Sequence, residues 1–217
     1  MANLADGYWQ KRLTNVGIAL EANKFDVYQA AHAEEAKKIT LERIMPPLKA
    51  KSVSWGGSMT LISTGIDQIL RSDKNLKVLD TQNRGIPFEE MLELRRRSLL
   101  VDLYLTGTNA VTEDGTLVNL DMHGNRVAAI TFGPRYVVVF AGRNKIVSNL
   151  DDAMFRIKNY AAPVNAMRLD RKTPCVQSSY CEDCKSDDRI CNSWTITEKS
   201  FPKGRIKVVL INEDIGL

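Results

Sequence analysis

The chain has 217 residues, of which 44% are hydrophobic, 26% charged and 7% aromatic, a composition that indicates a globular protein and excludes a wholly disordered one. The formal net charge of +4 is too small to predict a nucleic-acid partner, and the longest apolar runs, 127–130 and 136–142, are far shorter than the ~20 residues of a membrane helix. The first residues show no basic segment followed by an apolar stretch, so we expect no secretory signal, no membrane partner and a cytoplasmic location.

The spacing of apolar residues predicts two helices at the beginning of the chain, over 8–22 and 26–48. In the second of them, Ala36, Thr40 and Ile44 recur at helical spacing, and a pair of prolines at 46–47 ends the pattern. We therefore interpret residues 1–50 as an N-terminal helical extension of a single α/β domain that spans residues 51–217 and includes a cysteine segment over 173–192.

From residue 51 onward, strand patterns and helix patterns alternate. The residues 136–141 are almost wholly apolar, as in a strand that is buried on both faces of a parallel sheet. This alternation predicts an α/β fold with a mostly parallel sheet flanked by helices. The expected strands are 51–55, 76–80, 101–105, 116–120, 136–141 and a closing pair at 194–198 and 205–212; the expected helices are 59–70, 87–99, 124–130 and one from 149 that Pro163 ends.

Two loops rich in Gly, Ser, Thr and Asn each follow a predicted strand, over 54–60 and 105–119. Loops at the carboxyl ends of parallel strands converge on one crevice, and backbone N–H groups of such loops suit an anion. Neither loop has the spacing of a dinucleotide or phosphate-loop motif, and each is also explained as a tight turn. We predict a cleft that binds an anionic small molecule and is lined by Gly56, Gly57, Ser58, Thr60, Gly107, Thr108, Asn109, Asn119 and Gly124.

All four cysteines lie close together near the end of the chain, in the pattern C-x5-C-x2-C-x6-C. In a reducing compartment disulfides are not expected, and the x2 spacing matches the bite of a metal knuckle. Zn²⁺ favours sites of four thiolates. The prediction is one Zn²⁺ ion, with an iron–sulfur cluster or four metal-free thiols as the alternatives, at Cys175, Cys181, Cys184 and Cys191.

The order of these motifs resembles the LUD-domain family, whose members include lactate-utilisation proteins. The resemblance is carried by residues 55–60, by 106–119 with Gly124, and by 136–147; the cysteines and residues 204–214 resemble a subset of the family with a cysteine tail. It implies the fold shared by ribose-phosphate isomerases, coenzyme A transferases and formyltetrahydrofolate cyclo-ligases. It also implies a ligand bearing a phosphate, nucleotide or coenzyme A group, and partner proteins that hold the redox cofactors of lactate oxidation.

One position departs from what the resemblance implies. Sugar-phosphate isomerases of this fold carry a catalytic carboxylate directly after the Gly-x pair of the second loop, where this chain has Asn109. An asparagine cannot accept and return a proton as a carboxylate does, so the isomerase interpretation is weakened, although Asp121 is nearby. The two histidines, His32 and His123, are interpreted as a surface residue and a loop residue. We therefore assign no catalytic residue.

Three functions stay open at this stage. We favour a binding protein for an anionic small molecule, acting in lactate or organic-acid utilisation. The alternatives are an isomerase or an acyl- or coenzyme A-transfer enzyme of the same fold, and an interaction module whose metal-binding tail docks on a redox partner. Assembly of the chain into a homo-oligomer is compatible with all three.

The cysteine pattern makes a testable prediction. Anaerobically purified protein should contain one equivalent of zinc by elemental analysis, because four thiolates neutralise and enclose a Zn²⁺ ion. A brown colour with absorption near ~400 nm would indicate an iron–sulfur cluster instead. Protein that contains neither metal would contradict the prediction.

Overall fold

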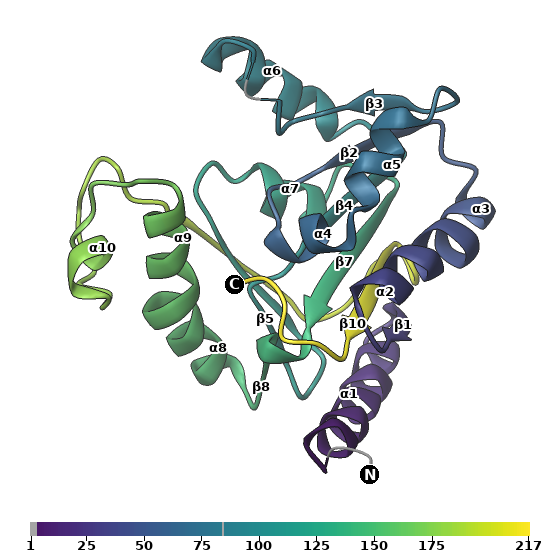
Figure 1. Cartoon of the computed structure of the whole chain (residues 1–217), viewed down its shortest axis with the longest axis horizontal. Helices are drawn as coiled ribbons and strands as arrows, with labels where there is room; N and C mark the ends of the chain where they lie inside the picture. Colours follow the sequence, from purple (N-terminus) through teal and green to yellow (C-terminus); the bar gives the residue numbers. More distant parts are fainter. Residues whose placement is uncertain (1–3, 84) are drawn as a thin grey trace.

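A computed structural model describes residues 4–83 and 85–217 of the chain, and its centre is a six-stranded sheet in which all neighbouring strands are parallel (Figure 1). The strands of this sheet lie in the order β1 (Asp26–Ala30), β10 (Ile206–Ile211), β7 (Tyr136–Gly142), β4 (Leu103–Gly107), β2 (Ser52–Trp55) and β3 (Lys77–Leu79). A smaller, mixed sheet has the order β8 (Ile146–Val147), β5 (Ala110–Thr112), β6 (Leu117–Asp121) and β9 (Ser193–Thr197). The predicted mostly parallel α/β fold is confirmed.

Strand β7 contributes to the core on both faces of the large sheet. Because successive side chains of a strand point to opposite faces, Val138 and Phe140 belong to one apolar cluster, and Val137, Val139 and Ala141 belong to the other. All five side chains are fully buried. The nearly continuous apolar run in the sequence is thus explained by burial on both faces.

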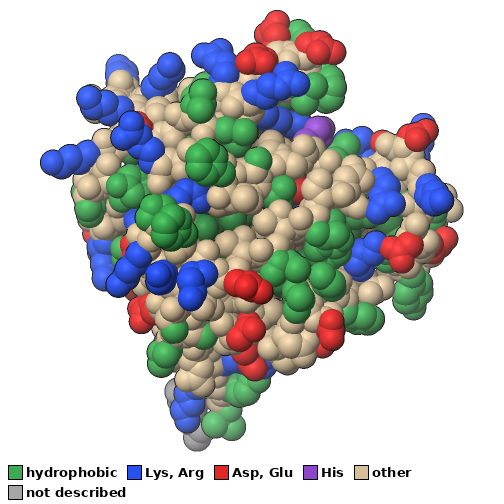
Figure 2. Space-filling model, turned by 180° about the vertical axis from the view of Figure 1, so that it is seen from behind, with side chains coloured by type: hydrophobic (Ala, Val, Ile, Leu, Met, Phe, Trp, Pro, Cys, Tyr) green, Lys and Arg blue, Asp and Glu red, His purple; other side chains and the backbone are tan. Residues whose placement is uncertain are grey.

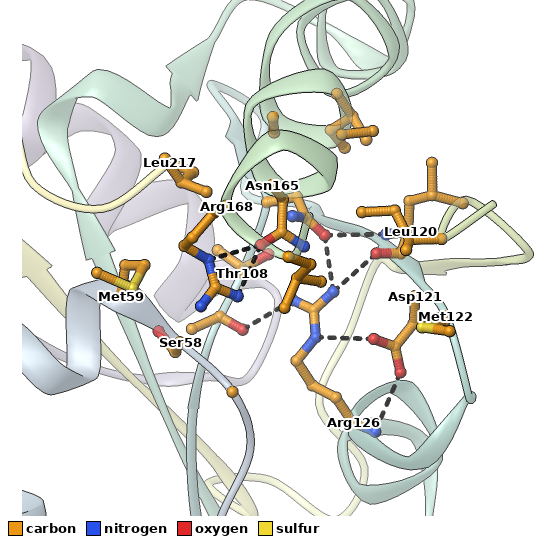
Figure 3. Close-up of a pocket in the computed structure, with 18 of the residues that line it drawn as sticks. Ser58, Met59, Thr108, Leu120, Asp121, Met122, Arg126, Asn165, Arg168 and Leu217 are labelled. Carbon is orange, nitrogen blue, oxygen red and sulfur yellow. Dashed lines mark hydrogen bonds and ion pairs between the residues drawn. The ribbon is translucent and has the colours of Figure 1, made fainter. Parts of the chain in front are cut away.

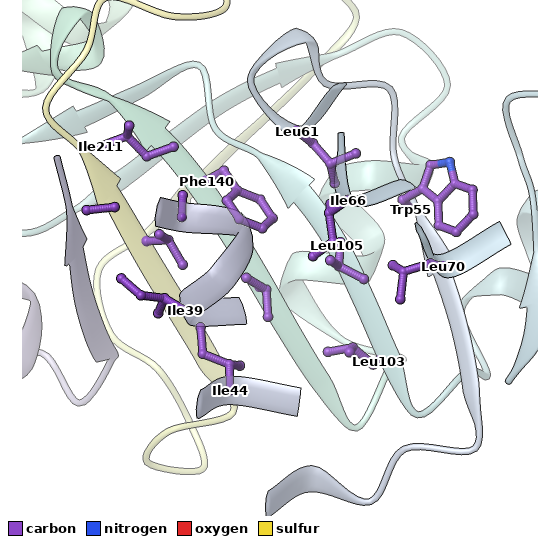
Figure 4. Close-up of a cluster of buried hydrophobic side chains, with 14 of the residues drawn as sticks. Ile39, Ile44, Trp55, Leu61, Ile66, Leu70, Leu103, Leu105, Phe140 and Ile211 are labelled. Carbon is purple, nitrogen blue, oxygen red and sulfur yellow. The ribbon is translucent and has the colours of Figure 1, made fainter. Parts of the chain in front are cut away.

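Helices cover both faces of the large sheet. On one face, α2 (Ala33–Ile39), α4 (Met59–Thr64) and α5 (Ile66–Ser72) pack against the strands and bury Ile39, Leu61 and Leu70 (Figure 4). On the other face lie α1 (Leu4–Ala22) and α7 (Asn125–Thr131). The short α3 (Met45–Leu48) and the longer α6 (Phe88–Ser98) complete this part of the fold.

No helix in the described ranges combines the length and apolar character that crossing a membrane requires.

The small sheet is covered by a continuous helical stretch. This stretch comprises α8 (Leu150–Arg156), a π-helical turn (Ile157–Ala161) and α9 (Ala162–Arg168), and it packs Ala153 and Ile157 against Val118 of β6. A short α10 (Pro174–Ser178) follows. The structure thereby places α9 beside the edge of the sheet at which the glycine loops lie (Figure 1).

Pro163 does not end this helix, contrary to the sequence prediction. A proline lacks the N–H that an α-helix needs, and its ring collides with the preceding turn. The wider π-helical turn just before Pro163 accommodates it, with the N–H of Ala162 donating to the carbonyl of Ile157. The prolines at 46–47 also follow a π-helical turn (Thr40–Ile44), and there the helix ends at Leu48 as expected.

The segment 26–30 is a strand rather than the start of a helix, which corrects the prediction for 26–48. Strand β1 pairs with β10, and Val27 and Tyr28 pack on opposite faces of the sheet. The helix begins only at Ala33, after His32 accepts a hydrogen bond from the N–H of Glu35. The predicted helical extension therefore supplies an edge strand to the main sheet, and residues 1–3 of it lie outside the described residues.

Three further differences concern element boundaries and pairing. The predicted helix 59–70 is divided into α4 and α5 by Gly65, which adopts a φ of +69°. The predicted closing strands do not pair, because β9 lies in the small sheet and β10 lies between β1 and β7. Strands β5 and β8 are not predicted from the sequence, since strands of two or three residues are too short to show a period.

The surface carries charges of both signs. Figure 2 shows Lys and Arg side chains over much of one face, with acidic and hydrophobic side chains between them. This distribution agrees with the small net charge of +4.

The contact between α1 and the turn after β5 generates a prediction about stability. Gly115 has a φ of +82°, and a Cβ there would lie 2.7 Å from backbone atoms of Ala19 and Leu20. Gly115→Ala should therefore strain the backbone and also push α1 away, lowering the free energy of unfolding in urea by about 3 kcal/mol. Gly65→Ala is the matched control, because Gly65 also has a positive φ but nothing within 4 Å, and it should cost about 1 kcal/mol. Equal losses in the two variants would contradict this packing.

Candidate functional site

The two glycine loops meet at the carboxyl edge of the large sheet. Gly56 directly follows β2, and Gly107 is the last residue of the neighbouring parallel strand β4. A Cβ on Gly56 would lie 2.9 Å from the Thr106 Oγ1, and a Cβ on Gly107 would collide with the Ser58 side chain. Glycine is therefore required at both positions for the loops to approach one another.

A pocket lies between the loops and helix α9 (Figure 3). The predicted residues that line it are Gly57, Ser58, Gly107, Thr108 and Asn109. The rest of its polar lining comes from Asp121, Arg126, Lys145, Asn165 and Arg168. Leu217, in the segment that follows β10, also borders the pocket. The structure thus brings most of the predicted loop residues together and adds basic residues that the sequence analysis does not name.

The other four predicted residues do not line the pocket. Gly56 lies behind the first loop, against Thr106. Thr60 is fully buried and accepts a hydrogen bond from Lys145. Asn119 is fully buried in β6, and Gly124 precedes α7, where a Cβ would meet nothing within 4 Å. Three of these four positions support the loops, and Gly124 is only the N-cap of α7.

Arg126, from the first turn of α7, fixes the second loop. Its guanidinium donates hydrogen bonds to the side-chain oxygens of Asn119 (2.9 Å) and Asn109 (2.8 Å). It also donates to the backbone carbonyls of Gly107 (3.3 Å) and Leu120 (2.9 Å), and its Nε lies 3.5 Å from a carboxylate oxygen of Asp121 (Figure 3). The side chain is 10% exposed. Arg126 therefore joins the loop to β6.

The Asn109 side chain has a structural role in this arrangement. Its Oδ1 accepts hydrogen bonds from Arg126 and from the backbone N–H of Leu120 (3.0 Å). The backbone N–H of Asn109 donates to the Oδ1 of Asn119. An amide oxygen engaged in this way holds the loop and has no proton to exchange. The position where the resemblance implies a carboxylate is thus occupied by a residue that shapes the pocket.

Lys145 connects the two loops through hydrogen bonds from its side chain. It ends a 3-10 turn (Arg143–Lys145) that directly follows β7, and its Nζ donates to the Thr60 Oγ1 (2.8 Å) and to the Thr108 carbonyl (3.0 Å). The side chain is only 4% exposed. Burial lowers the pKa of Lys145 to about 7, with smaller contributions from Arg156 and Arg126, and no acidic group of the described chain counters them.

Two more arginines make the surroundings of the pocket positive. Arg156 of α8 donates to the Asn109 carbonyl (2.9 Å), and burial lowers its pKa. Arg168 of α9 lies at the mouth of the pocket, where Asn165 accepts hydrogen bonds from its Nε and Nη2 (Figure 3). Asp121 is the acidic residue among the described lining residues. Because Asp121 is already paired with Arg126, it does not neutralise Lys145.

The sequence contains a signal that could have identified Lys145. Lys145 follows the strand pattern 136–141 by a few residues, and β7 is the parallel neighbour of β4. The carboxyl end of β7 must then lie at the same edge as the two glycine loops. Arg126 and Arg168 have no comparable signal, because their positions depend on how α7 and α9 pack.

The four cysteines are not gathered into a metal site. Cys175 lies in α10, Cys181 and Cys184 lie in the following loop, and Cys191 packs near Ile157; all four are partly exposed thiols. Among residues 4–83 and 85–217, no group of three or more His, Cys, Asp or Glu side chains is placed to hold a metal ion. Metal binding at these four cysteines stays a prediction from the sequence.

A family model described as the LUD domain matches residues 14–211. A crystal structure of a DUF162 family protein from Deinococcus radiodurans aligns with a TM-score of 0.52 and 13% identity, covering 94% of this chain and 98% of that chain. A ribose 5-phosphate isomerase from Plasmodium falciparum aligns with a TM-score of 0.31 and 16% identity, over 54% and 52% of the two chains. Only the first alignment supports a shared fold, and no curated protein matches.

The Arg126 network generates a prediction about the stability of the site. Arg126→Met keeps the apolar stem but leaves buried oxygen acceptors without their donor, so the free energy of unfolding in urea should fall by about 3 kcal/mol. Arg135→Met is the control, because the Arg135 side chain is 79% exposed and forms a surface ion pair with Asp102. The control should change stability by no more than ~0.5 kcal/mol. A similar effect for both arginines would refute the structural role of Arg126.

Proposed function

The chain belongs to the LUD domain family, and we propose that it binds an anionic small molecule in the pocket between its two glycine loops. The observation that carries the proposal is Lys145, a buried amine that ties both loops together and has no acidic partner among the described residues. Burying a cation without a counter-charge is unfavourable. An anionic ligand in the pocket would supply that counter-charge.

The rest of the lining supports the same chemistry. Arg168 at the mouth and the Ser58 hydroxyl in the first loop are donors that face the pocket (Figure 3). Phosphate and carboxylate groups are the common biological anions that such donors recognise. A phosphate-, nucleotide- or coenzyme A-bearing ligand, as the family resemblance implies, fits this donor set. We place the activity in lactate or organic-acid utilisation in the cytoplasm, alongside redox partner proteins, on the strength of that resemblance alone.

A sugar-phosphate isomerase is the less favoured function. Asn109 holds the loop with its amide oxygen, and Asp121 is engaged both by the Arg126 guanidinium and by the Arg126 N–H (3.2 Å). Neither group is free to carry a proton between two carbon atoms of a substrate. Binding alone requires the fewest assumptions about the residues present.

Calorimetric titration with sulfate tests the proposal, because sulfate keeps its charge between pH 6 and pH 9. Lys145 carries a proton below its pKa of about 7 and loses it as the pH rises, so the affinity should fall by about tenfold over this range. Lys145→Met should bind weakly and without this pH dependence. Titrations with phosphate, a nucleotide and coenzyme A then identify the ligand class.

Gly57→Leu provides a second variant for the same titration. A Cβ at Gly57 makes only ordinary contact, 3.6 Å from Gln82, so the protein should fold while the larger side chain fills the pocket and abolishes binding. Arg135→Met, remote from the pocket, should bind sulfate normally. Wild-type affinity in Lys145→Met, or binding that survives in Gly57→Leu, would place the anion elsewhere.

A further inference from the structure

Two lysines of the described chain are almost fully buried, and they differ in their partners. Lys207 is 5% exposed and forms an ion pair with Asp26 at 3.0 Å, so its charge is compensated. Lys145 is 4% exposed, and its Nζ donates hydrogen bonds to a hydroxyl oxygen and a carbonyl oxygen rather than to a carboxylate. An amine that is buried without a carboxylate is held partly in its neutral form, which has a free lone pair.

The position of this amine suits it to react as well as to bind. Lys145 lines the pocket, and its two hydrogen bonds to Thr60 and Thr108 fix the direction of its Nζ. Thr60 Oγ1 in turn lies 3.4 Å from the Ile215 carbonyl, to which it donates its proton, so it receives the Lys145 hydrogen bond as an acceptor. A neutral amine held in a pocket next to cationic donors is a nucleophile with an anion-binding subsite beside it.

We propose that Lys145 forms a reversible imine with a small carbonyl compound that carries an anionic group. The inference rests on the proposed function, because the anion-binding residues of the same pocket would hold the charged end of that compound. The Nζ lone pair attacks the carbonyl carbon and forms a C–N bond. The two hydrogens of the neutral amine leave with the carbonyl oxygen as water, and hydrolysis reverses the reaction without an oxidant or a reductant.

The charge around Lys145 predicts which carbonyl compounds react. A protonated imine would place a positive charge near Arg126 and Arg156, which already disfavour the charged amine. The anionic group of the ligand offsets this repulsion. A neutral aldehyde lacks that compensation and should react poorly, so selectivity for anionic carbonyl compounds is a signature of this site.

Trapping the imine by reduction tests the proposal. The protein is incubated at pH 7 with glyoxylate, with glycolaldehyde phosphate or with neutral glycolaldehyde, reduced with cyanoborohydride, and mapped by peptide mass spectrometry. About half of a lysine with a pKa near 7 is free amine, against on the order of one in three thousand for an exposed lysine. The adduct at Lys145 should exceed that at any other lysine at least ~10-fold, and the more reactive anionic probe identifies a carboxylate or a phosphate ligand.

Two comparisons make the experiment decisive. Lys145→Arg should abolish the adduct while Lys158→Arg leaves it unchanged, and the peptide with Lys207 is an internal control for a buried but paired lysine. Sulfate should compete with the anionic probes. Adducts spread evenly over exposed lysines, or equal reaction with neutral glycolaldehyde, would overturn the proposal. Calorimetric sulfate binding without an adduct at Lys145 would exclude the imine and leave the binding function intact, whereas loss of both would refute both.

Discussion

The burial of strand β7 on both faces is the constraint on which the rest of the structure depends. Its alternate side chains enter two separate apolar clusters, so helices must cover the sheet on both sides. In a parallel sheet of this kind all the strands end at one edge, and the polar loops after β2, β4 and β7 are forced together there. The pocket is a geometric consequence of the core rather than a separate construction.

At that edge, some polar side chains hold the loops in place and others line the pocket. The hydrogen bonds of Arg126 and Asn109 hold the second loop to β6, and they thereby fix the shape of the pocket. Lys145 belongs to both loops and also lines the cavity. A single amine therefore couples the spacing of the loops to the electrostatic state of the pocket, because loss of its proton weakens both hydrogen-bonded contacts and the attraction for an anion at once.

The fold and the two-loop arrangement follow from local patterns, while the basic residues of the site do not. The sequence alone shows long apolar runs such as 136–141 and glycines that follow predicted strands. The sheet and the converging loops could therefore be predicted. The edge strand β1 was missed because Val27 and Tyr28 fit a helix pattern as well as a strand, and only pairing with β10 decides between them. Arg126 and Arg168 reach the pocket through the packing of α7 and α9, which is tertiary information. Two π-helical turns likewise decide what Pro46 and Pro163 do.

The strand order has a consequence for how the chain acquires its structure. Strand β10 is inserted between β1 and β7, and Lys207 in it pairs with Asp26 across 181 positions of sequence. Pairing between residues so distant in sequence is slow, because the entropy of closing the long loop is lost before any stabilising contact forms. While a ribosome is still making the chain, β1 and β7 have no common neighbour, and the backbone N–H and C=O groups on those edges stay unpaired. The sheet can close only once residues 206–211 have emerged, which makes the nascent chain dependent on protection until its last strand arrives.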